Sequence, residues 1–205
     1  GFKNLRRAGL NYVEKVVNFI SYNNKEVMTL RKFTYMILLL NLFQSCNSKH
    51  QPLEVVGSVN LESYQGTWYE IARLPNRFEK GLKCITAHYE LEKNGKITVI
   101  NKGHKIDNPG VIESVKGTAK VPNEEEPGKL KVTFFWPFYG KYWIIDLDKN
   151  YQYALVGSPS RKYLWILSRN KTMEDETFQR LTKIAREQEF DVSRLIRTPH
   201  NCQLQ

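Results

Sequence analysis

The feature that most constrains this 205-residue sequence is a regular succession of short apolar or alternating segments between residues 66 and 168. Turn-forming residues separate the segments, for example Asn94-Gly95 and Ser158-Pro159-Ser160. This rhythm is typical of an antiparallel barrel or sandwich. Eight strands linked in order can close on themselves and leave no exposed edge. The expected strands are 66–74, 83–92, 96–104, 111–121, 129–136, 141–148, 151–157 and 162–168.

Some of these segments are apolar on both faces, and the barrel interior can bury only one face of each strand. A second element must cover the other face. Residues after Thr172 provide it, because Thr172 suits an N-cap and acidic residues follow in the first turn. Apolar residues then recur at helical spacing, at Phe178, Leu181, Ile184 and Ala185. The expected fold class is all-β, an eight-stranded antiparallel up-and-down barrel with one C-terminal α-helix packed on its outside.

Positive charge is concentrated near the N-terminus. Residues 1–45 hold seven Lys and Arg against two Glu, which is +5 of the formal net charge of +10. The rest of the chain has no basic stripe with interleaved aromatic residues, which argues against nucleic-acid binding.

Residues 28–45 have the organisation of a secretory signal: basic Arg31 and Lys32, an apolar run over 33–43, and a small residue, Ser45, before Cys46. The run is shorter than the roughly 20 residues that span a bilayer. A buried core helix is the alternative interpretation. We expect 1–27 to be an extension upstream of the natural start and not a domain, 46–59 to be a linker, and 60–205 to form the folded domain.

The sequence Leu42-Phe43-Gln44-Ser45-Cys46 resembles a bacterial lipoprotein processing site. The resemblance implies that Cys46 is lipidated and becomes the mature N-terminus, and several acyl chains would make a lasting membrane anchor. An Asn, and not an Asp, at position 47 directly after the cysteine resembles the sequence of lipoproteins that are sorted to the outer membrane. The implied location is therefore the bacterial outer membrane, with the protein exported and lipid-anchored.

Two motifs carry a resemblance to a family. Gly66-Thr67-Trp68 matches the glycine-x-tryptophan signature of the lipocalins, and residues 153–169 resemble the final hairpin of the bacterial lipocalin and apolipoprotein D-like group. The resemblance implies that Gly66, Trp68 and Arg169 are structural, with Trp68 closing one end of the barrel and Arg169 stacking on it. It also implies a disulfide between Cys84 and Cys202, which export permits.

No catalytic or metal-binding motif is present, since the four histidines (His50, His88, His104 and His200) are scattered and no phosphate-binding glycine loop occurs. We therefore expect a binding protein and not an enzyme, with no cofactor and no metal. Two alternatives stay open: a structural envelope lipoprotein with a filled barrel, and a lipocalin-type enzyme that uses a free Cys84 thiol. A homodimer is compatible with the sequence.

An eight-stranded barrel holds one small ligand. Strand alternation alone selects eight inward positions, most of them large and apolar. Such a lining suits an elongated apolar molecule, and the family's preference implies fatty acids or lysophospholipids. The ligand's polar group would lie at the mouth, where Lys80, Lys83, Lys102 or Lys105 are candidates to contact it; the alternative interpretation is that these lysines are solvated loop charges. The expected cavity residues are Ala72, Tyr89, Val99, Val115, Phe134, Tyr142, Leu155 and Trp165.

Overall fold

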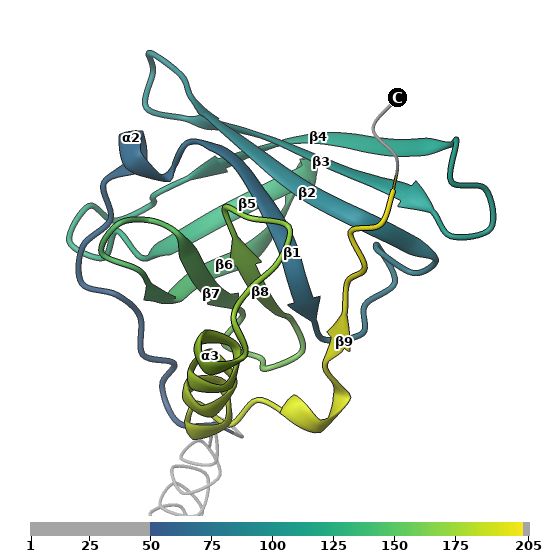
Figure 1. Cartoon of the computed structure of the whole chain (residues 1–205). Helices are drawn as coiled ribbons and strands as arrows, with labels where there is room; N and C mark the ends of the chain where they lie inside the picture. The colour runs from purple at the N-terminus through teal and green to yellow at the C-terminus, as the bar shows by residue number, and fades with distance from the viewer. Residues whose placement is uncertain (1–49, 203–205) are drawn as a thin grey trace, which may run out of the picture. The chain divides into compact units, whose positions relative to one another are not determined.

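The computed structural model describes residues 50–202, which form a closed antiparallel barrel (Figure 1). Hydrogen-bonded neighbours follow the order β2-β3-β4-β5-β6-β7-β8-β1, and β1 also pairs with β2, which closes the sheet. The eight predicted strands and their up-and-down order are confirmed. The strands are β1 (Gly66–Arg73), β2 (Leu82–Leu91), β3 (Ile97–Lys105), β4 (Ile112–Lys120), β5 (Lys129–Phe135), β6 (Phe138–Leu147), β7 (Tyr153–Gly157) and β8 (Leu164–Ser168).

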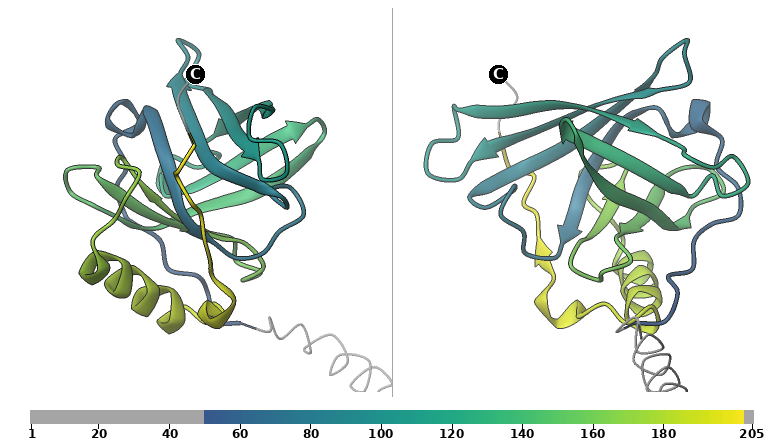
Figure 2. Two further views of the ribbon diagram at one scale, coloured as in Figure 1. Left: turned by 45° about the vertical axis from the view of Figure 1, so that its right-hand side comes forward. Right: turned by 180° about the vertical axis from the view of Figure 1, so that it is seen from behind.

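The barrel has two different ends. Because consecutive strands are antiparallel, the β1–β2, β3–β4, β5–β6 and β7–β8 connections lie at one end, which we call the open end. The β2–β3, β4–β5 and β6–β7 connections lie at the other, which we call the capped end. Helix α2 (Leu61–Tyr64) precedes β1 at the capped end (Figures 1 and 2). The Asn60 side chain caps it by accepting a hydrogen bond from the Ser63 amide.

The predicted C-terminal helix is present as α3 (Asp175–Glu187), and it lies against the outside of the barrel (Figure 1). It begins later than predicted: Glu174, not Thr172, is the N-cap. Glu174 has an extended backbone, and Asp175 and Glu176 fill the first turn, so the acidic residues still face the positive end of the helix dipole. A short 3₁₀ turn η1 (Val192–Arg194) and strand β9 (Ile196–Arg197), neither predicted from sequence, follow, and β9 pairs with β1.

Apolar side chains gather on both faces of the sheet. One cluster fills the barrel interior around Trp68, Tyr89 and Ile144. The other lies between the barrel and α3, where Leu181 and Ala185 of the helix are fully buried. The helix therefore covers the second apolar face, as its sequence pattern predicted.

The predicted signal segment (28–45), the predicted lipidation site Cys46 and the extension 1–27 lie outside the residues that the structure describes. Within residues 50–202, no helix has the length and apolar character needed to cross a membrane.

Candidate functional site

The capped end is closed by the lipocalin-like motif residues. Trp68 has no exposed surface, and its indole N–H donates to the Tyr64 carbonyl at 2.9 Å. The Arg169 guanidinium lies 3.9 Å from the centroid of the Trp68 ring, a cation–π contact. Gly66 has a φ of +91°, and a Cβ there would lie 3.4 Å from the Arg169 guanidinium. The glycine thus permits both the backbone conformation and the approach of the arginine.

Arg169 also ties three segments of backbone together. Its guanidinium donates to the carbonyls of Ser63 at 2.9 Å, Thr67 at 3.0 Å and Tyr151 at 3.2 Å. One side chain therefore joins α2, the first strand and the β6–β7 connection. This geometry supports a structural role for Trp68 and Arg169.

Three phenols lie next to this cap, inside the barrel. The Tyr142 hydroxyl is within 2.8 Å of the hydroxyls of both Tyr64 and Tyr89. Burial raises the pKa of all three phenols, so they remain neutral and share protons in hydrogen bonds. They satisfy one another's polar atoms in an otherwise apolar interior.

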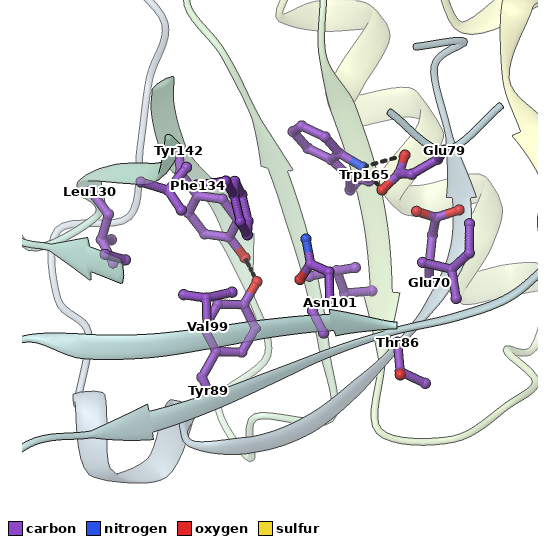
Figure 3. A pocket seen from close by; sticks show the side chains of 15 residues that line it. Glu70, Glu79, Thr86, Tyr89, Val99, Asn101, Leu130, Phe134, Tyr142 and Trp165 are labelled. Carbon is purple, nitrogen blue, oxygen red and sulfur yellow. Dashed lines mark hydrogen bonds between the residues drawn. The ribbon is translucent and has the colours of Figure 1, made fainter. Parts of the chain in front are cut away.

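Between the phenols and the open end is a cavity of about 80 Å³, enough for several water molecules. Its walls come from seven strands, every one except β7, and from the β1–β2 connection; Figure 3 shows the side chains that line it. The part near the phenols is apolar, whereas Glu70, Glu79 and Asn101 give the opposite side polar groups. The lining residues are Glu70, Glu79, Ile85, Thr86, Ala87, Tyr89, Val99, Asn101, Ala119, Leu130, Val132, Phe134, Tyr142, Trp165 and Leu167.

Five of the eight predicted cavity residues line this space, and the structure brings them together: Tyr89, Val99, Phe134, Tyr142 and Trp165.

The other three predicted positions lie elsewhere, so the sequence-based prediction was wrong for them. Ala72 follows an irregularity between Glu70 and Ala72, after which it pairs with Ile166 and faces α3. Leu155 also pairs with Ile166 and shares its outward face. Val115 is 37% exposed on β4, beyond the cavity. The prediction assumed that side chains alternate strictly between the inner and outer face of the barrel. This assumption fails at Ala72 because a bulge reverses the alternation, at Leu155 because the cross-strand register was unknown, and at Val115 because the strand extends past its neighbours.

Several lining residues were missed by sequence reasoning. Leu130 and Val132 are four and two residues from Phe134, and Leu167 is two residues from Trp165, so each lies on the same strand face as a predicted cavity residue. Strand alternation could therefore have identified them. Glu70 likewise shares the parity of Trp68. Glu79 lies in the β1–β2 connection, where no periodic pattern exists, and only the structure reveals it.

The polar side of the cavity is built around a buried arginine. Arg73 donates from Nη1 to Glu70 Oε1 at 2.7 Å and to the Thr198 hydroxyl at 3.0 Å, and from Nη2 to the Glu79 carbonyl at 2.9 Å. The Trp165 indole N–H lies 3.2 Å from both Glu79 carboxylate oxygens (Figure 3). Burial, and then the nearby Glu79 charge, raise the pKa of Glu70 to about 8 despite Arg73. The burial of Glu70 therefore favours its protonated form.

The four lysines expected near the mouth do not reach the cavity lining. Lys105 forms an ion pair with Glu113 at 3.2 Å, and the Lys83 ammonium lies 3.5 Å from the Asn201 side-chain oxygen. Lys80 and Lys102 are exposed. The charged and amide groups that line the cavity are thus Glu70, Glu79 and Asn101, and the lysines fit the alternative interpretation, solvated loop charges.

Among residues 50–202, no group of three or more His, Cys, Asp or Glu side chains is arranged to hold a metal ion. His88 contacts Thr67 and His104 contacts the Pro109 carbonyl, and the β2–β3 register does not pair the two histidines.

The two cysteines in the described region are joined. The disulfide links Cys84 at the start of β2 to Cys202 across 118 residues of sequence, as the family resemblance implied. The bond leaves no free thiol at Cys84, which the enzymatic alternative requires. It holds the C-terminal segment along the barrel wall.

Comparison with known proteins agrees with this architecture. The lipocalin-like domain family matches residues 59–200. The chain is 45% identical over 157 residues to the outer membrane lipoprotein Blc of Escherichia coli K12, covering 76% of this chain and 88% of that protein. It is 39% identical over 148 residues to apolipoprotein D of Macaca fascicularis, covering 68% and 76% of the two chains.

The barrel is also similar to a solved structure. Insecticyanin from the tobacco hornworm Manduca sexta superimposes with a TM-score of 0.61 at 24% identity, over 76% of this chain and 90% of that one, which establishes likeness of fold. The closed barrel, the Trp68–Arg169 cap and the match over most of the chain together show that this protein belongs to the lipocalin family.

Proposed function

We propose that this protein binds and carries or stores an elongated hydrophobic ligand, a fatty acid or lysophospholipid, inside the barrel. The observation that carries the proposal is the interior cavity, which is apolar next to the three phenols and polar toward the open end. That arrangement suits a molecule with an apolar chain and one polar end. The chain also resembles the outer membrane lipoprotein Blc and apolipoprotein D.

A filled structural barrel is the second candidate, and the small cavity volume favours it. A chain of about ten methylenes contributes roughly 8 kcal/mol when buried, but it needs more room than about 80 Å³. Entry of such a chain requires the lining to open. Phe134 is the natural moving part, because it is only partly buried and lies over Gly117, where a Cβ would be 2.6 Å from its ring.

The experiment is titration of the Cys46→Ser protein with fatty acids of increasing chain length. The carrier function predicts micromolar or tighter affinity that rises with length and then levels off. Ala87→Trp, on the cavity wall, should abolish uptake, while Lys116→Trp, exposed on β4, should not. Equal affinity for short and long chains, or normal uptake by Ala87→Trp, would instead favour the filled barrel.

We also propose that Cys46 is lipidated and holds the protein on the bacterial outer membrane. The support is the signal-like segment 28–45, the Ser45-Cys46 boundary and the resemblance to outer membrane lipoproteins. In a Gram-negative host, Cys46→Ser should move the protein out of the membrane fraction. Unchanged partitioning would contradict the anchor.

A further inference from the structure

The open end carries an unusual concentration of exposed apolar side chains. Of the ten large hydrophobic residues that are exposed among residues 50–202, eight lie in the open-end connections or within two residues of them. None lies in a capped-end connection. These eight, which we call the apolar rim, are Phe78, Ile106, Val111, Ile112, Phe135, Trp136, Phe138 and Tyr139.

The β5–β6 hairpin is the most exposed part of the apolar rim. Phe135, Trp136 and Phe138 are 73, 81 and 78% exposed, and Pro137 stands between them. Each aromatic side chain presents about 150–250 Å² of surface to water, which a soluble fold ordinarily buries. An exposed patch of this kind marks a surface that meets a partner or a membrane.

Exposed cations outnumber exposed acids in the open-end connections. Arg77 and Lys80 in the β1–β2 connection and Lys162 in the β7–β8 connection are exposed, against Asp107 in the β3–β4 connection. By contrast, the β4–β5 connection at the capped end holds three consecutive glutamates, Glu124 to Glu126. Aromatic tips with nearby cations match an anionic bilayer surface, where aromatic residues enter the interface and Lys and Arg contact the head groups.

The beginning of the described chain lies at the same end. Gln51 accepts a hydrogen bond from Arg161 of the β7–β8 connection at 2.7 Å, and the His50 imidazole contacts Glu189 at 2.8 Å. Cys46 is only four residues before His50, a span of at most about 14 Å. A lipid on Cys46 would therefore start from the end of the barrel that carries the apolar rim.

We propose that the apolar rim is a membrane-docking surface, so that the open end of the barrel rests directly on the bilayer. The inference rests on the proposed carrier function and membrane anchor, and it adds to them a route for the ligand. An acyl chain passes between bilayer and cavity through the open end without crossing water. The hairpin aromatics enter the interface, and the surrounding Arg and Lys side chains contact anionic head groups.

The first test measures depth in the membrane. The protein is placed in vesicles of phosphatidylethanolamine and phosphatidylglycerol whose acyl chains carry bromine, which quenches nearby tryptophan. Trp136→Phe should remove most of the quenching. Trp143→Phe is the matched control and should retain the quenching, because Trp143 lies on the same hairpin but is partly buried and is not in the apolar rim. Equal quenching in the two variants would overturn the proposal.

The second test separates docking from ligand binding. Trp136→Ser/Phe138→Ser should slow transfer of a fluorescent fatty acid from vesicle to barrel at least about tenfold, because two aromatic side chains lose their membrane contact. Affinity for the same fatty acid dissolved in water should stay within about twofold. Trp136→Leu/Phe138→Leu, which keeps the apolar surface, should restore transfer.

The outcomes are distinguishable. If the unsubstituted protein does not bind the dissolved fatty acid, the carrier function is wrong. If the serine variant and the unsubstituted protein take up the fatty acid from vesicles at the same rate, docking is wrong. If the serine variant instead converts a dimer to a monomer in solution and leaves quenching and transfer unchanged, the apolar rim is a contact between two copies, and membrane docking is wrong.

Discussion

The two ends of the barrel solve opposite problems. At the capped end, Trp68 is fully buried, Arg169 stacks on it, and three backbone carbonyls accept from the same guanidinium. At the open end, Trp136 is 81% exposed, and the polar residues that line the cavity lie just inside. The aromatic side chain at the capped end, Trp68, is buried and stabilises the fold. The aromatic side chain at the open end, Trp136, is exposed and available for contact with a partner.

The open end nevertheless has its own structural support. Arg73, Glu70 and Thr198 join the end of β1 to the C-terminal segment, and Arg73 also holds the Glu79 carbonyl of the β1–β2 connection. The disulfide adds a covalent link between β2 and Cys202. Packing holds the capped end, whereas a cross-link and a buried polar cluster hold the open end.

Removing the disulfide should have a large effect on stability. Replacing both Cys84 and Cys202 with serine frees a loop of 118 residues in the unfolded chain, which lowers the free energy of unfolding by up to about 4.7 kcal/mol in the loop-entropy model. Denaturant unfolding of the oxidised protein and of the variant measures this. Intact mass after alkylation is the control, and two freely alkylating thiols in the folded oxidised protein would contradict the bond.

The capped end should respond next. Arg169→Lys keeps a positive charge near Trp68 but replaces three guanidinium nitrogens, each bonded to a different carbonyl, with a single nitrogen, so we expect a loss of about 2 kcal/mol. Arg77→Lys, an exposed arginine of the open end, is the matched control and should change stability by less than about 0.5 kcal/mol. Equal effects would mean that the cap adds no more stability than the exposed arginine does.

The buried acid at the open end should make the stability of the protein depend on pH. The pKa of Glu70 is raised to about 8 in the folded protein, so the folded state retains a proton that the unfolded chain loses near pH 4.5. The stability that comes from retaining this proton is therefore fully present below pH 4.5 and is lost as the pH rises toward 8. Glu70→Gln does not titrate.

Between pH 5 and 8, unsubstituted protein should progressively lose stability relative to Glu70→Gln. Unfolding curves across this range measure the difference. Glu90→Gln, exposed on β2, is the control and should follow the unsubstituted protein. A constant difference between Glu70→Gln and unsubstituted protein would show that Glu70 titrates alike in both states.

Local chemistry made much of the fold predictable. Turn residues and alternating runs located all eight strands, and the helical stripe located α3, because each pattern depends on neighbouring residues. The Trp68–Arg169 pair and the disulfide came from the family resemblance. The start of α3 was misplaced, because an N-cap depends on backbone conformation at Glu174.

The candidate site was less predictable, because it depends on register between strands. Ala72 was misplaced by an irregularity in β1, Leu155 by its pairing with Ile166, and Glu79 was missed because a connection has no period. The sequence offered lysines at the mouth as candidate partners for the ligand's polar group, whereas the charged side chains that line the cavity are acidic. Side-chain direction at a bulge or loop is decided by tertiary contacts that no short window of sequence contains.

The smallest expected effect on stability belongs to the most conspicuous residues of the open end. Phe135, Trp136 and Phe138 are at least 73% exposed, so replacing them gives up little buried surface, and Trp136→Ser/Phe138→Ser should change the free energy of unfolding by less than about 0.5 kcal/mol. Trp68→Ala at the capped end, which empties a fully buried site, should cost about 3–5 kcal/mol. Thermal and denaturant unfolding in the absence of lipid compare the two. A large loss in the serine variant would mean that the hairpin aromatics support the barrel itself, and their exposure could then no longer be read as a surface kept for the membrane.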